Sequence, residues 1–352
     1  MPTQRSSSTG TIKTPPPDDP TVSPIENTIA LTQLSDLGPN VFTNSRPQWQ
    51  PLGARGIYGG SVIAQSLLAA QMTVPAAFVP HSMHCYFVLA GDARIPILYH
   101  VDVVRSGRSF HTRTVQARQR GRAIFTTTCS FTLPLAEEEE GGAKTRVAHR
   151  PVFPVAALRG AEDCEGELQV VDRLLRQGRI DEELAALGRA RIARDPFEWR
   201  SLGIAAASPD APPAAKVMRQ WVRSKASIAN PLFCMPALAY FSDSWFIGTV
   251  GRVNPAARRE RVGMMVSLDH TIHFHTAERV KLDEWLLVET ESPWAGEERG
   301  LVTMKVWTAD GTLVASCLQE GIVRLKDGRE GEVQEAGTTT PTVDNTAPQA
   351  KL

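Results

Sequence analysis

The sequence predicts an α+β protein in which one unit, a helix followed by antiparallel strands, occurs twice. Three observations lead to this prediction. An apolar helical segment precedes a series of strand-like runs, the same order returns in the second half of the chain, and a glycine turn leads into the last strand of each half. Because hairpin-length connections dominate over long crossovers, we expect an antiparallel sheet.

The first unit covers residues 29–133 and contains a helix expected at 61–72. The helix follows Tyr58-Gly59-Gly60, and Pro75 ends its pattern. Strand-like runs follow at 83–89, 97–104, 109–119 and 123–131. The apolar positions that recur at helical spacing are Ile63, Leu67, Ala70 and Val74.

The second unit covers residues 216–326, with a strand at 217–224 before a helix expected at 237–250. Further strands are expected at 264–274, 284–291, 300–308 and 312–323, and the hairpin turn Asp310-Gly311 separates the last two. The side chains that share one face of the helix are Leu238, Phe241, Trp245 and Thr249.

The two units also match in detail, since Gly121-Arg-Ala-Ile-Phe and Gly311-Thr-Leu-Val-Ala each lead into a last strand. An internal match of this kind indicates one fold used twice. Five or six antiparallel strands curved around one apolar helix form the hotdog arrangement. The sequence therefore predicts a double hotdog.

Three further segments complete the organisation. Residues 1–28 and 327–352 are polar and should be disordered tails, because they cannot bury enough apolar area to fold. The connector at 134–215 should contain a helix at 165–187 and a strand at 197–204. A connection of this length is unusual in a compact domain, so we expect it to pack on the outside or to extend a sheet.

Composition and charge exclude several classes of protein. The 352 residues include 38 Lys plus Arg and 38 Asp plus Glu, a balance that argues against a dedicated nucleic-acid-binding protein. No apolar run approaches the roughly 20 residues of a membrane span, and the N-terminus lacks the apolar core of a secretory signal. The five cysteines are far apart and odd in number, which indicates neither a disulfide framework nor a thiolate zinc site and fits a reducing compartment.

Two polar residues in apolar surroundings are candidates for catalysis. Asp243 lies in an apolar helical stretch, where desolvation would tune its pKa for base catalysis. Its alternatives are a helix cap shared with Ser242 and a buried structural aspartate. Gln319 lies in the last strand, and its amide is suited to fixing a water and polarising a carbonyl. The alternative for Gln319 is a polar residue on an edge strand.

The strand that contains Ser267 also carries three histidines. Alternation predicts that His270 takes one face and that the other face carries Ser267, Asp269, Thr271, His273 and His275. His273 and His275 suggest a metal, but no further cluster of ligands supports one, so we predict no metal site. The sequence has no Gly-x-Ser-x-Gly motif, which leaves a hydrolase with an activated serine unsupported.

Substrate-binding candidates lie in the first unit and at His270. Backbone N–H groups at Gly59-Gly60 suit an oxyanion or a phosphate, although close packing of the helix explains these glycines equally well. Three arginines near one strand end would bind the phosphates of a nucleotide-like ligand, or would form a solvated basic edge. These arginines are Arg105, Arg108 and Arg113.

The order of these motifs is similar to that of the type II acyl-CoA thioesterases, a double-hotdog family with bacterial and peroxisomal members. The similarity covers residues 30–325 and departs at His273, where the family commonly has tryptophan. The serine at 267 and the stretch that begins at Glu291 are closer to the peroxisomal branch. The matching segments are Tyr58-Gly-Gly-Ser-Val-Ile-Ala-Gln, His81-Ser-Met-His-Cys-Tyr-Phe, Arg105-Ser-Gly-Arg-Ser-Phe, Ser242-Asp243, Ser267-Leu-Asp-His, Glu284-Trp-Leu-Leu, Glu291-Ser-Pro-Trp-Ala-Gly, Arg299-Gly-Leu and Gln319-Glu-Gly.

The resemblance implies hydrolysis of acyl-CoA to a free fatty acid and CoA, with catalytic residues at Asp243, Ser267 and Gln319. Asp243 would accept a proton from a water that Ser267 and Gln319 hold, so neither an acyl-enzyme nor a cofactor is required. The alternatives on this scaffold are a non-hydrolytic acyl-CoA or lipid-binding protein, an acyltransferase and a hydratase. The intact trio argues against the binding protein, and the lack of a histidine on the helix around Asp243 argues against the hydratase.

The last three residues, Ala350-Lys351-Leu352, resemble the Ser-Lys-Leu signal for peroxisomal import. A polar tail would present this end to an import receptor, so the expected location is the peroxisome matrix, with the cytoplasm as the alternative. The sequence is compatible with a homo-oligomer and contains no indication of the preferred acyl-chain length.

Overall fold

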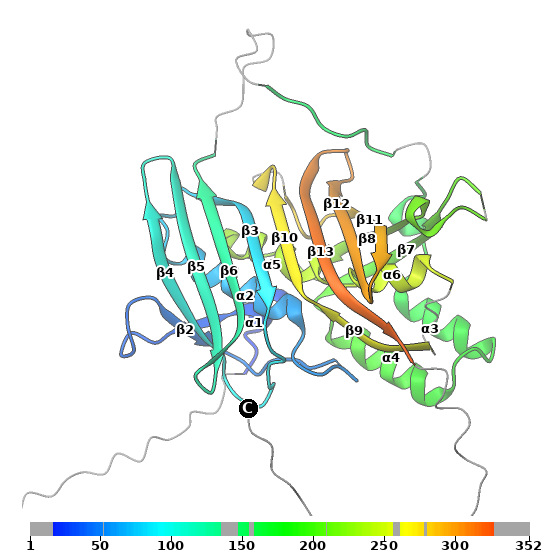
Figure 1. Cartoon of the computed structure of the whole chain (residues 1–352), viewed down its shortest axis with the longest axis horizontal. Coiled ribbons are helices and arrows are strands. Elements are labelled where there is room, and N and C mark those ends of the chain that lie inside the picture. The colour runs from blue at the N-terminus through cyan, green and yellow to red at the C-terminus, as the bar shows by residue number, and fades with distance from the viewer. Residues whose placement is uncertain are drawn as a thin grey trace, which may run out of the picture.

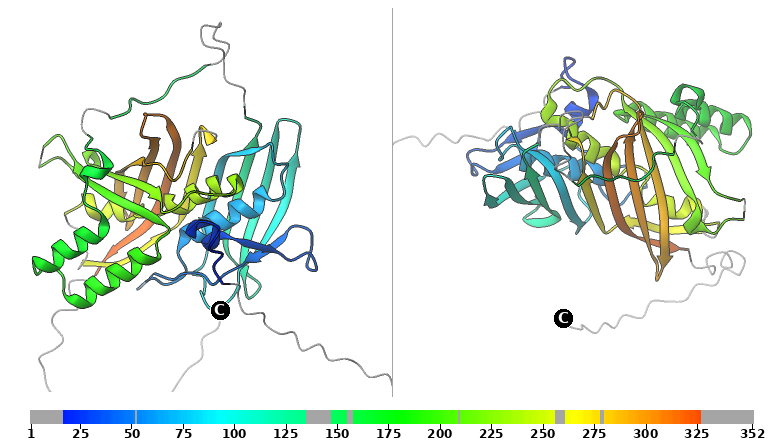
Figure 2. Two further views of the ribbon diagram at one scale, coloured as in Figure 1. Left: turned by 180° about the vertical axis from the view of Figure 1, so that it is seen from behind. Right: turned by 90° about the horizontal axis from the view of Figure 1, so that it is seen from above.

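The computed structural model describes residues 17–51, 53–134, 147–154, 158–208, 210–255, 261–277 and 280–326. Within these residues, thirteen strands form one sheet, and helices cover one of its faces (Figures 1 and 2). The order of hydrogen-bonded strands is β1-β2-β4-β5-β6-β3-β10-β13-β12-β11-β8-β7, and β9 pairs with β13 as well. The sheet therefore contains the strands of both predicted units.

The first hotdog surrounds helix α2, Gly59–Gln71, which is buried along almost its whole length. The four predicted strands are present within a few residues of their expected bounds. The sequence does not predict β1 and β2, because three or four residues are too few to show an alternating pattern. The strands are β1 Leu31–Gln33, β2 Val41–Asn44, β3 Val79–Phe87, β4 Leu98–Ser106, β5 Phe110–Gln119 and β6 Arg122–Thr132.

The second hotdog surrounds helix α5, Cys234–Ser242. The turn at Asp310-Gly311 joins β12 to β13 as predicted, and Gly311 adopts φ +88°, which glycine tolerates without steric cost. The repetition of one helix-and-strand unit confirms the predicted α+β double hotdog. The strands are β7 Phe197–Ala205, β8 Val217–Ser224, β9 Val262–Ser267, β10 Asp269–Phe274, β11 Leu286–Gly296, β12 Arg299–Thr308 and β13 Leu313–Leu325.

The two hotdogs share one sheet and one core. Strands β3 and β10 pair antiparallel at the seam, where Cys85 lies opposite His270. On the covered face α2 packs against α5, and one cluster of buried side chains runs from Ile63 in α2 to Phe241 in α5. Both helices are apolar on nearly every side, because each contacts the sheet and the other helix.

The connector forms two helices where the sequence predicts a single helix at 165–187. These helices are α3, Glu167–Arg176, and α4, Glu182–Arg194. Gly178 adopts φ +64° and turns the chain between them, and the side chain of Asp181 caps α4. Strand β7 then pairs with β8 at the edge of the sheet. The connector therefore extends the sheet, which is one of the two arrangements that we expected.

The prediction of a disordered segment at 1–28 is wrong for its last residues. Helix α1, Pro24–Ile29, begins with a capping box between Ser23 and Glu26. The Glu26 carboxylate also accepts the backbone N–H groups of Ala229 and Asn230, which precede α5. The segment is ordered because this carboxylate has partners in the second hotdog. Residues 1–16, 135–146 and 327–352, which include the expected C-terminal signal, lie outside the described residues.

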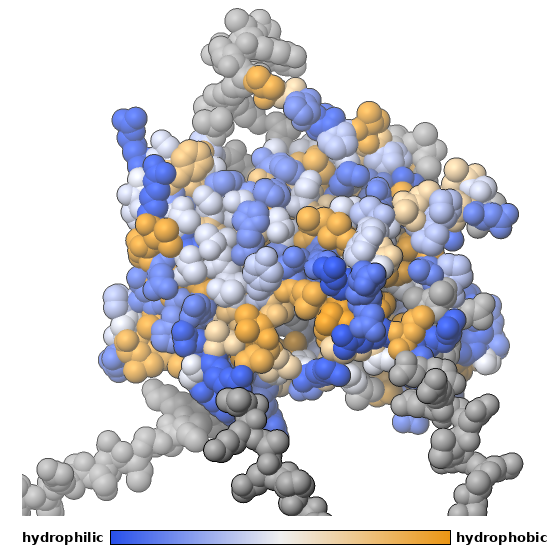
Figure 3. Space-filling view, viewed as in Figure 1, coloured by the Kyte–Doolittle hydropathy of each residue, from blue (hydrophilic) through white to orange (hydrophobic). Residues whose placement is uncertain are grey.

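The uncovered face of the sheet is pale in the hydropathy view over β5 and β6 (Figure 3). The outward side chains there are mainly threonine and serine, and the Thr114 and Thr128 hydroxyls lie 3.1 Å apart in a hydrogen bond. Over β5 and β6 this face is therefore polar but carries few charges. In the part of the chain that the structure describes, no helix has the length and apolar composition needed to cross a membrane.

Candidate active site

Asp243 lies at a break in the helix predicted at 237–250. Helix α5 ends at Ser242, with Asp243 as its C-cap residue, and α6, Gly248–Val253, begins after a short turn. Within this turn Trp245 adopts φ +62°, a left-handed conformation that is rare for a large side chain. The break places the Asp243 carboxylate beyond the last turn of α5 instead of along a continuous helix.

The Asp243 carboxylate accepts hydrogen bonds from both hotdogs. Gln319 Nε2 in β13 donates to Oδ1 at 2.8 Å, and the backbone N–H of Gly60 in α2 also donates to the carboxylate. Burial raises the pKa of Asp243 above its ordinary value, and these two hydrogen bonds oppose that rise. Asp243 is the C-cap residue of α5, as the alternative of a helix cap expects, but the Ser242 hydroxyl bonds to Ala239 and His270 and does not share this cap.

Gln319 lies on a central strand, and the edge-strand interpretation is therefore wrong. Strand β13 pairs with β12 on one side and with β9 and β10 on the other. Gln319 Nε2 donates to Asp243 Oδ1 at 2.8 Å and to Ser267 Oγ at 2.9 Å. Its Oε1 is buried and has no partner among the described residues. Because both amide hydrogens are in use, the amide has a fixed orientation and Oε1 remains a free acceptor.

Ser267 lies on the inner face of the sheet, contrary to the predicted alternation. The strand predicted at 264–274 is divided into β9 and β10. Ser267 is opposite Gly321 in β13 whereas Thr271 is opposite Leu318, so the register shifts by one residue between these two pairs. A shift of one residue moves side chains to the opposite face. The residues wrongly predicted to share the face of Ser267 are Asp269, Thr271, His273 and His275.

The glycines at the start of α2 allow Asp243 to approach the helix. A Cβ atom at Gly59 would lie 2.7 Å from Asp243 Oδ2, and one at Gly60 would lie 2.3 Å from the backbone oxygen of Tyr240. Close packing therefore explains both glycines. The N–H of Gly60 does bind an anionic oxygen, as the other interpretation expects, but this oxygen belongs to Asp243.

His270 supports α5 from the inner face of the sheet. Its Nε2 lies 3.0 Å from Ser242 Oγ, one residue before Asp243, and burial lowers its pKa to about 3. The ring is therefore neutral at physiological pH. The side chain is fully buried and bonds to Ser242, and the contact between His270 and substrate stays a prediction.

The three candidate arginines do not form one group. Arg105 and Arg108 are exposed where β4 turns into β5, and both interpretations of these two stay open. Arg113 is buried, and its guanidinium donates to the backbone oxygens of Arg105 at 2.6 Å and Thr73 at 3.0 Å. Because this guanidinium is used within the fold, the prediction that Arg113 binds a phosphate is wrong.

The sequence reasoning missed Tyr58 as part of the site. The Tyr58 hydroxyl donates to the backbone oxygen of Tyr240 at 2.9 Å and lies 2.7 Å from Ser244 Oγ. It thereby ties the start of α2 to the turn that follows Asp243. The feature of the sequence that could have identified Tyr58 is its position directly before the pair Gly59-Gly60. In the described ranges, no group of three or more His, Cys, Asp or Glu side chains is arranged to hold a metal ion.

Comparisons with known proteins assign the chain to a family. The family model for the acyl-CoA thioesterase C-terminal domain matches residues 173–323, and the model for the N-terminal domain matches residues 45–132. Acyl-coenzyme A thioesterase 8 of Rattus norvegicus is 36% identical over 308 residues, which cover 84% of this chain and 88% of that protein. The chain belongs to the acyl-CoA thioesterase family.

Similarity to other acyl-CoA thioesterases extends to yeast and bacteria. The peroxisomal acyl-coenzyme A thioester hydrolase 1 of Saccharomyces cerevisiae is 26% identical, and the match covers 85% of this chain and 95% of that protein. The crystal structure of acyl-CoA thioesterase II from Mycobacterium marinum has a TM-score of 0.64 at 28% identity, covering 87% of this chain and 99% of that one. These matches confirm the resemblance to type II acyl-CoA thioesterases and to their peroxisomal branch.

Proposed function

We propose that the protein hydrolyses acyl-CoA to a free fatty acid and CoA through a water that Asp243 activates and that Ser267 and Gln319 hold. The observation that carries this proposal is the Gln319 amide, which donates to Asp243 at 2.8 Å and to Ser267 at 2.9 Å. One buried amide thus brings together a carboxylate, a hydroxyl and its own free oxygen, three groups that can bind one water. Family membership supports the thioester as the bond that is attacked.

In the proposed reaction, water attacks the thioester carbonyl carbon directly. The Asp243 carboxylate accepts a proton as the new carbon–oxygen bond forms, and the carbonyl oxygen becomes an oxyanion. The carbon–sulfur bond then breaks, and the CoA thiolate takes up the proton held by Asp243. A pKa raised by burial makes this carboxylate a stronger base than an ordinary aspartate. The positive end of α2 contacts Asp243, so it lies close to the developing oxyanion.

Other functions of the scaffold are less consistent with this site. An acyltransferase that uses an acyl-enzyme needs an activated nucleophile, but Ser267 Oγ accepts a hydrogen bond from an amide and has no base as a partner among the described residues. A hydratase would pair a histidine with the aspartate, but His270 bonds to Ser242 instead. The hydrogen bonds that join Asp243, Gln319 and Ser267 favour catalysis over the binding of lipid alone.

The test is a free-thiol release assay with acetyl-CoA, octanoyl-CoA and palmitoyl-CoA, accompanied by intact-mass spectrometry during turnover. We expect release of CoA without a covalent acyl adduct on the protein. A stable adduct on Asp243 or Ser267 would exclude direct attack by water. No thiol release from any of the three substrates would refute the function itself.

We further propose that the enzyme acts in the peroxisome matrix. The C-terminal Ala350-Lys351-Leu352 and the similarity to a peroxisomal hydrolase of yeast support this location. An import receptor reads a free end, so deletion of Leu352 should leave activity unchanged and make the protein cytosolic. If the full-length protein and a fluorescent protein fused to the C-terminal tail are both diffuse in cells, the proposed location is wrong.

A further inference from the structure

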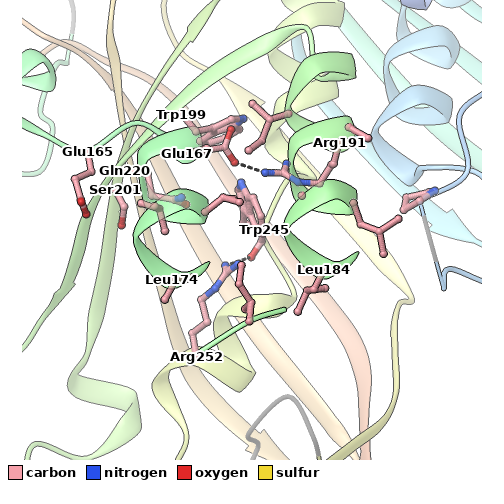
Figure 4. Close-up of a pocket in the computed structure, with 18 of the residues that line it drawn as sticks. Glu165, Glu167, Leu174, Leu184, Arg191, Trp199, Ser201, Gln220, Trp245 and Arg252 are labelled. Carbon is pink, nitrogen blue, oxygen red and sulfur yellow. Dashed lines mark hydrogen bonds and ion pairs between the residues drawn. The ribbon is translucent and has the colours of Figure 1, made fainter. Parts of the chain in front are cut away.

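The connector helices line a large, partly open cavity beside the turn that begins at Asp243. The cavity has a volume of about 1020 Å³ and lies between α3 and α4 on one side and β7 and β8 on the other (Figure 4). This is the upper end of the range for small-molecule sites, which are mostly apolar with a few polar groups. Figure 4 shows Trp245 near its centre, with Leu174 of α3 and Leu184 of α4 on either side.

Helix α3 presents an apolar face that the described structure buries only in part. Val170, Val171 and Leu174 lie along one side of this helix and line the cavity. An amphipathic helix normally buries such a face in a core, yet none of the residues of α3 is buried. The three side chains are also absent from the described hydrophobic core. Leaving part of this face in contact with water forgoes some of the stabilisation that burial gives, which indicates that an apolar ligand covers the remainder.

Trp245 connects the cavity to the proposed catalytic residues. Its ring lies between two guanidinium groups, with Arg191 Cζ 4.7 Å and Arg252 Cζ 4.6 Å from the ring centroid. The same residue has φ +62° and follows Asp243 by two positions. Side chains held in rare backbone conformations cluster at functional sites. Here the conformation directs the tryptophan into the cavity while Asp243 contacts β13 and α2.

Charges at the edge of the cavity suit an amphiphile with an anionic group. Arg191 is paired with Glu167 and lies 3.6 Å from Asp195. Arg252 and Arg194 also line the cavity, are exposed, and have no carboxylate partner among the described residues. An apolar interior with two unpaired cations at its edge matches a fatty acyl chain attached to a phosphate-bearing carrier.

We infer that this cavity receives the fatty acyl chain of the substrate, so that the connector helices set the preference for longer chains. The inference rests on the proposed acyl-CoA hydrolysis and adds the substrate class. A short acyl group bound at Asp243 would leave the face of α3 uncovered, whereas a long chain that passes Trp245 would cover it. Each buried methylene group contributes about fourfold in affinity, so affinity should rise steeply with chain length.

The test is Leu174→Trp, which fills the cavity from α3, compared with Leu168→Trp on the same helix. Leu168 is 50% exposed and does not line the cavity, so it is a matched control. For Leu174→Trp we expect the ratio of kcat/KM for palmitoyl-CoA to that for butyryl-CoA to fall at least tenfold. For Leu168→Trp the ratio should stay within about twofold of the original protein. An unchanged ratio in a folded Leu174→Trp protein would overturn the inference.

Binding of non-hydrolysable analogues separates this inference from the proposed function. Calorimetry should show that S-hexadecyl-CoA binds more tightly than S-butyl-CoA. In Leu174→Trp the ratio of the two dissociation constants should be at least tenfold smaller. That result would support the cavity as the acyl site even if no thioester were hydrolysed. Equal binding of both analogues would overturn the inference while leaving hydrolysis untouched. If Leu174→Trp changed the oligomeric state instead, a second copy of the chain would be the occupant and the inference would be wrong.

Discussion

Asp243→Asn is the most direct test of the proposed chemistry, because it removes the proton acceptor while keeping the shape of the side chain. The aspartate accepts hydrogen bonds from Gln319 and from the backbone of Gly60. An asparagine has one oxygen and one NH₂ group, so it can accept from one donor but presents a donor to the other. The perturbation therefore affects both turnover and stability, and the two effects can be measured separately.

Turnover should fall by about 10²- to 10⁴-fold, which is the usual contribution of a general base and corresponds to about 3–5 kcal/mol of transition-state stabilisation. Stability involves two opposing effects. Because burial raises the pKa of Asp243, its contribution to stability is complete below the unfolded pKa and is lost as the pH rises through the folded pKa. Asparagine does not ionise, so the variant avoids this loss of stability at neutral pH. Its NH₂ group, however, faces a donor that the carboxylate accepted, which costs about 0.5–1.5 kcal/mol of stability. We expect little change in Tm near pH 7 and a lower Tm near pH 3.

The measurements are kcat/KM by free-thiol release and Tm by scanning fluorimetry across this pH range. Asp269→Asn is a matched control, because Asp269 is nearby in β10 and its Oδ1 accepts the backbone N–H of Glu320 instead of contacting the site. This control should keep kcat/KM within a few-fold of the original value. A folded Asp243→Asn protein with near-normal turnover would refute the assignment of Asp243 as the base.

Three further predictions follow from the contacts around Asp243. Gln319→Ala removes a hydrogen bond that lowers the pKa of Asp243, so the acidic limb of the profile of kcat/KM against pH should move to higher pH. If this limb did not move, the Gln319 amide would not influence the ionisation of Asp243. Ser267→Ala and Gln319→Ala should each reduce kcat/KM, and the double variant should lose less than the product of the single losses, because both residues act on one water; strictly multiplicative losses would indicate separate steps. Burial lowers the pKa of His270 to about 3 from 6.5, so its contribution to stability is complete above pH 6.5 and falls by about 1.4 kcal/mol per pH unit as the pH decreases toward 3. Urea unfolding of His270→Gln at several pH values should show a correspondingly shallower loss, and a slope identical to that of the original protein would show that His270 is not the group responsible.

Much of the fold was predictable because local patterns determine it. Helix α2 lies where apolar residues recur at helical spacing before Pro75, and the β12–β13 hairpin turns at Asp310-Gly311. The divided helices were harder to predict. The chain from 237 to 247 contains neither proline nor glycine, so its composition favours continuation of the helix. The break at Trp245 instead coincides with contacts between its ring and two arginines, of which Arg191 is distant in sequence and Arg252 follows in α6.

Arg113 and His270 show why the chemistry of a residue does not by itself reveal its role. An arginine at a strand end and a histidine beside a candidate serine both have the right groups for binding a CoA ester. In the structure, Arg113 donates to the backbone oxygen of Thr73, and His270 contacts Ser242. Both side chains are buried and bond to groups within the fold, although His270 Nδ1 has no partner among the described residues. Exposure depends on the tertiary arrangement and is not readable from the local sequence.

Ser267 illustrates the same limit at the site itself, because its residue type suits the proposed role while strand alternation gives it the wrong face. Its position depends on a one-residue shift in pairing with β13, between the pair Ser267–Gly321 and the pair Thr271–Leu318. Without this shift β9 would continue into β10 in one register, and the hydroxyl would point to the uncovered face. Gln319 would then lose the hydrogen bond that it makes to Ser267 Oγ at 2.9 Å. The proposed water site thus depends on an irregularity in the sheet, and such irregularities re-aim side chains next to active sites in many proteins.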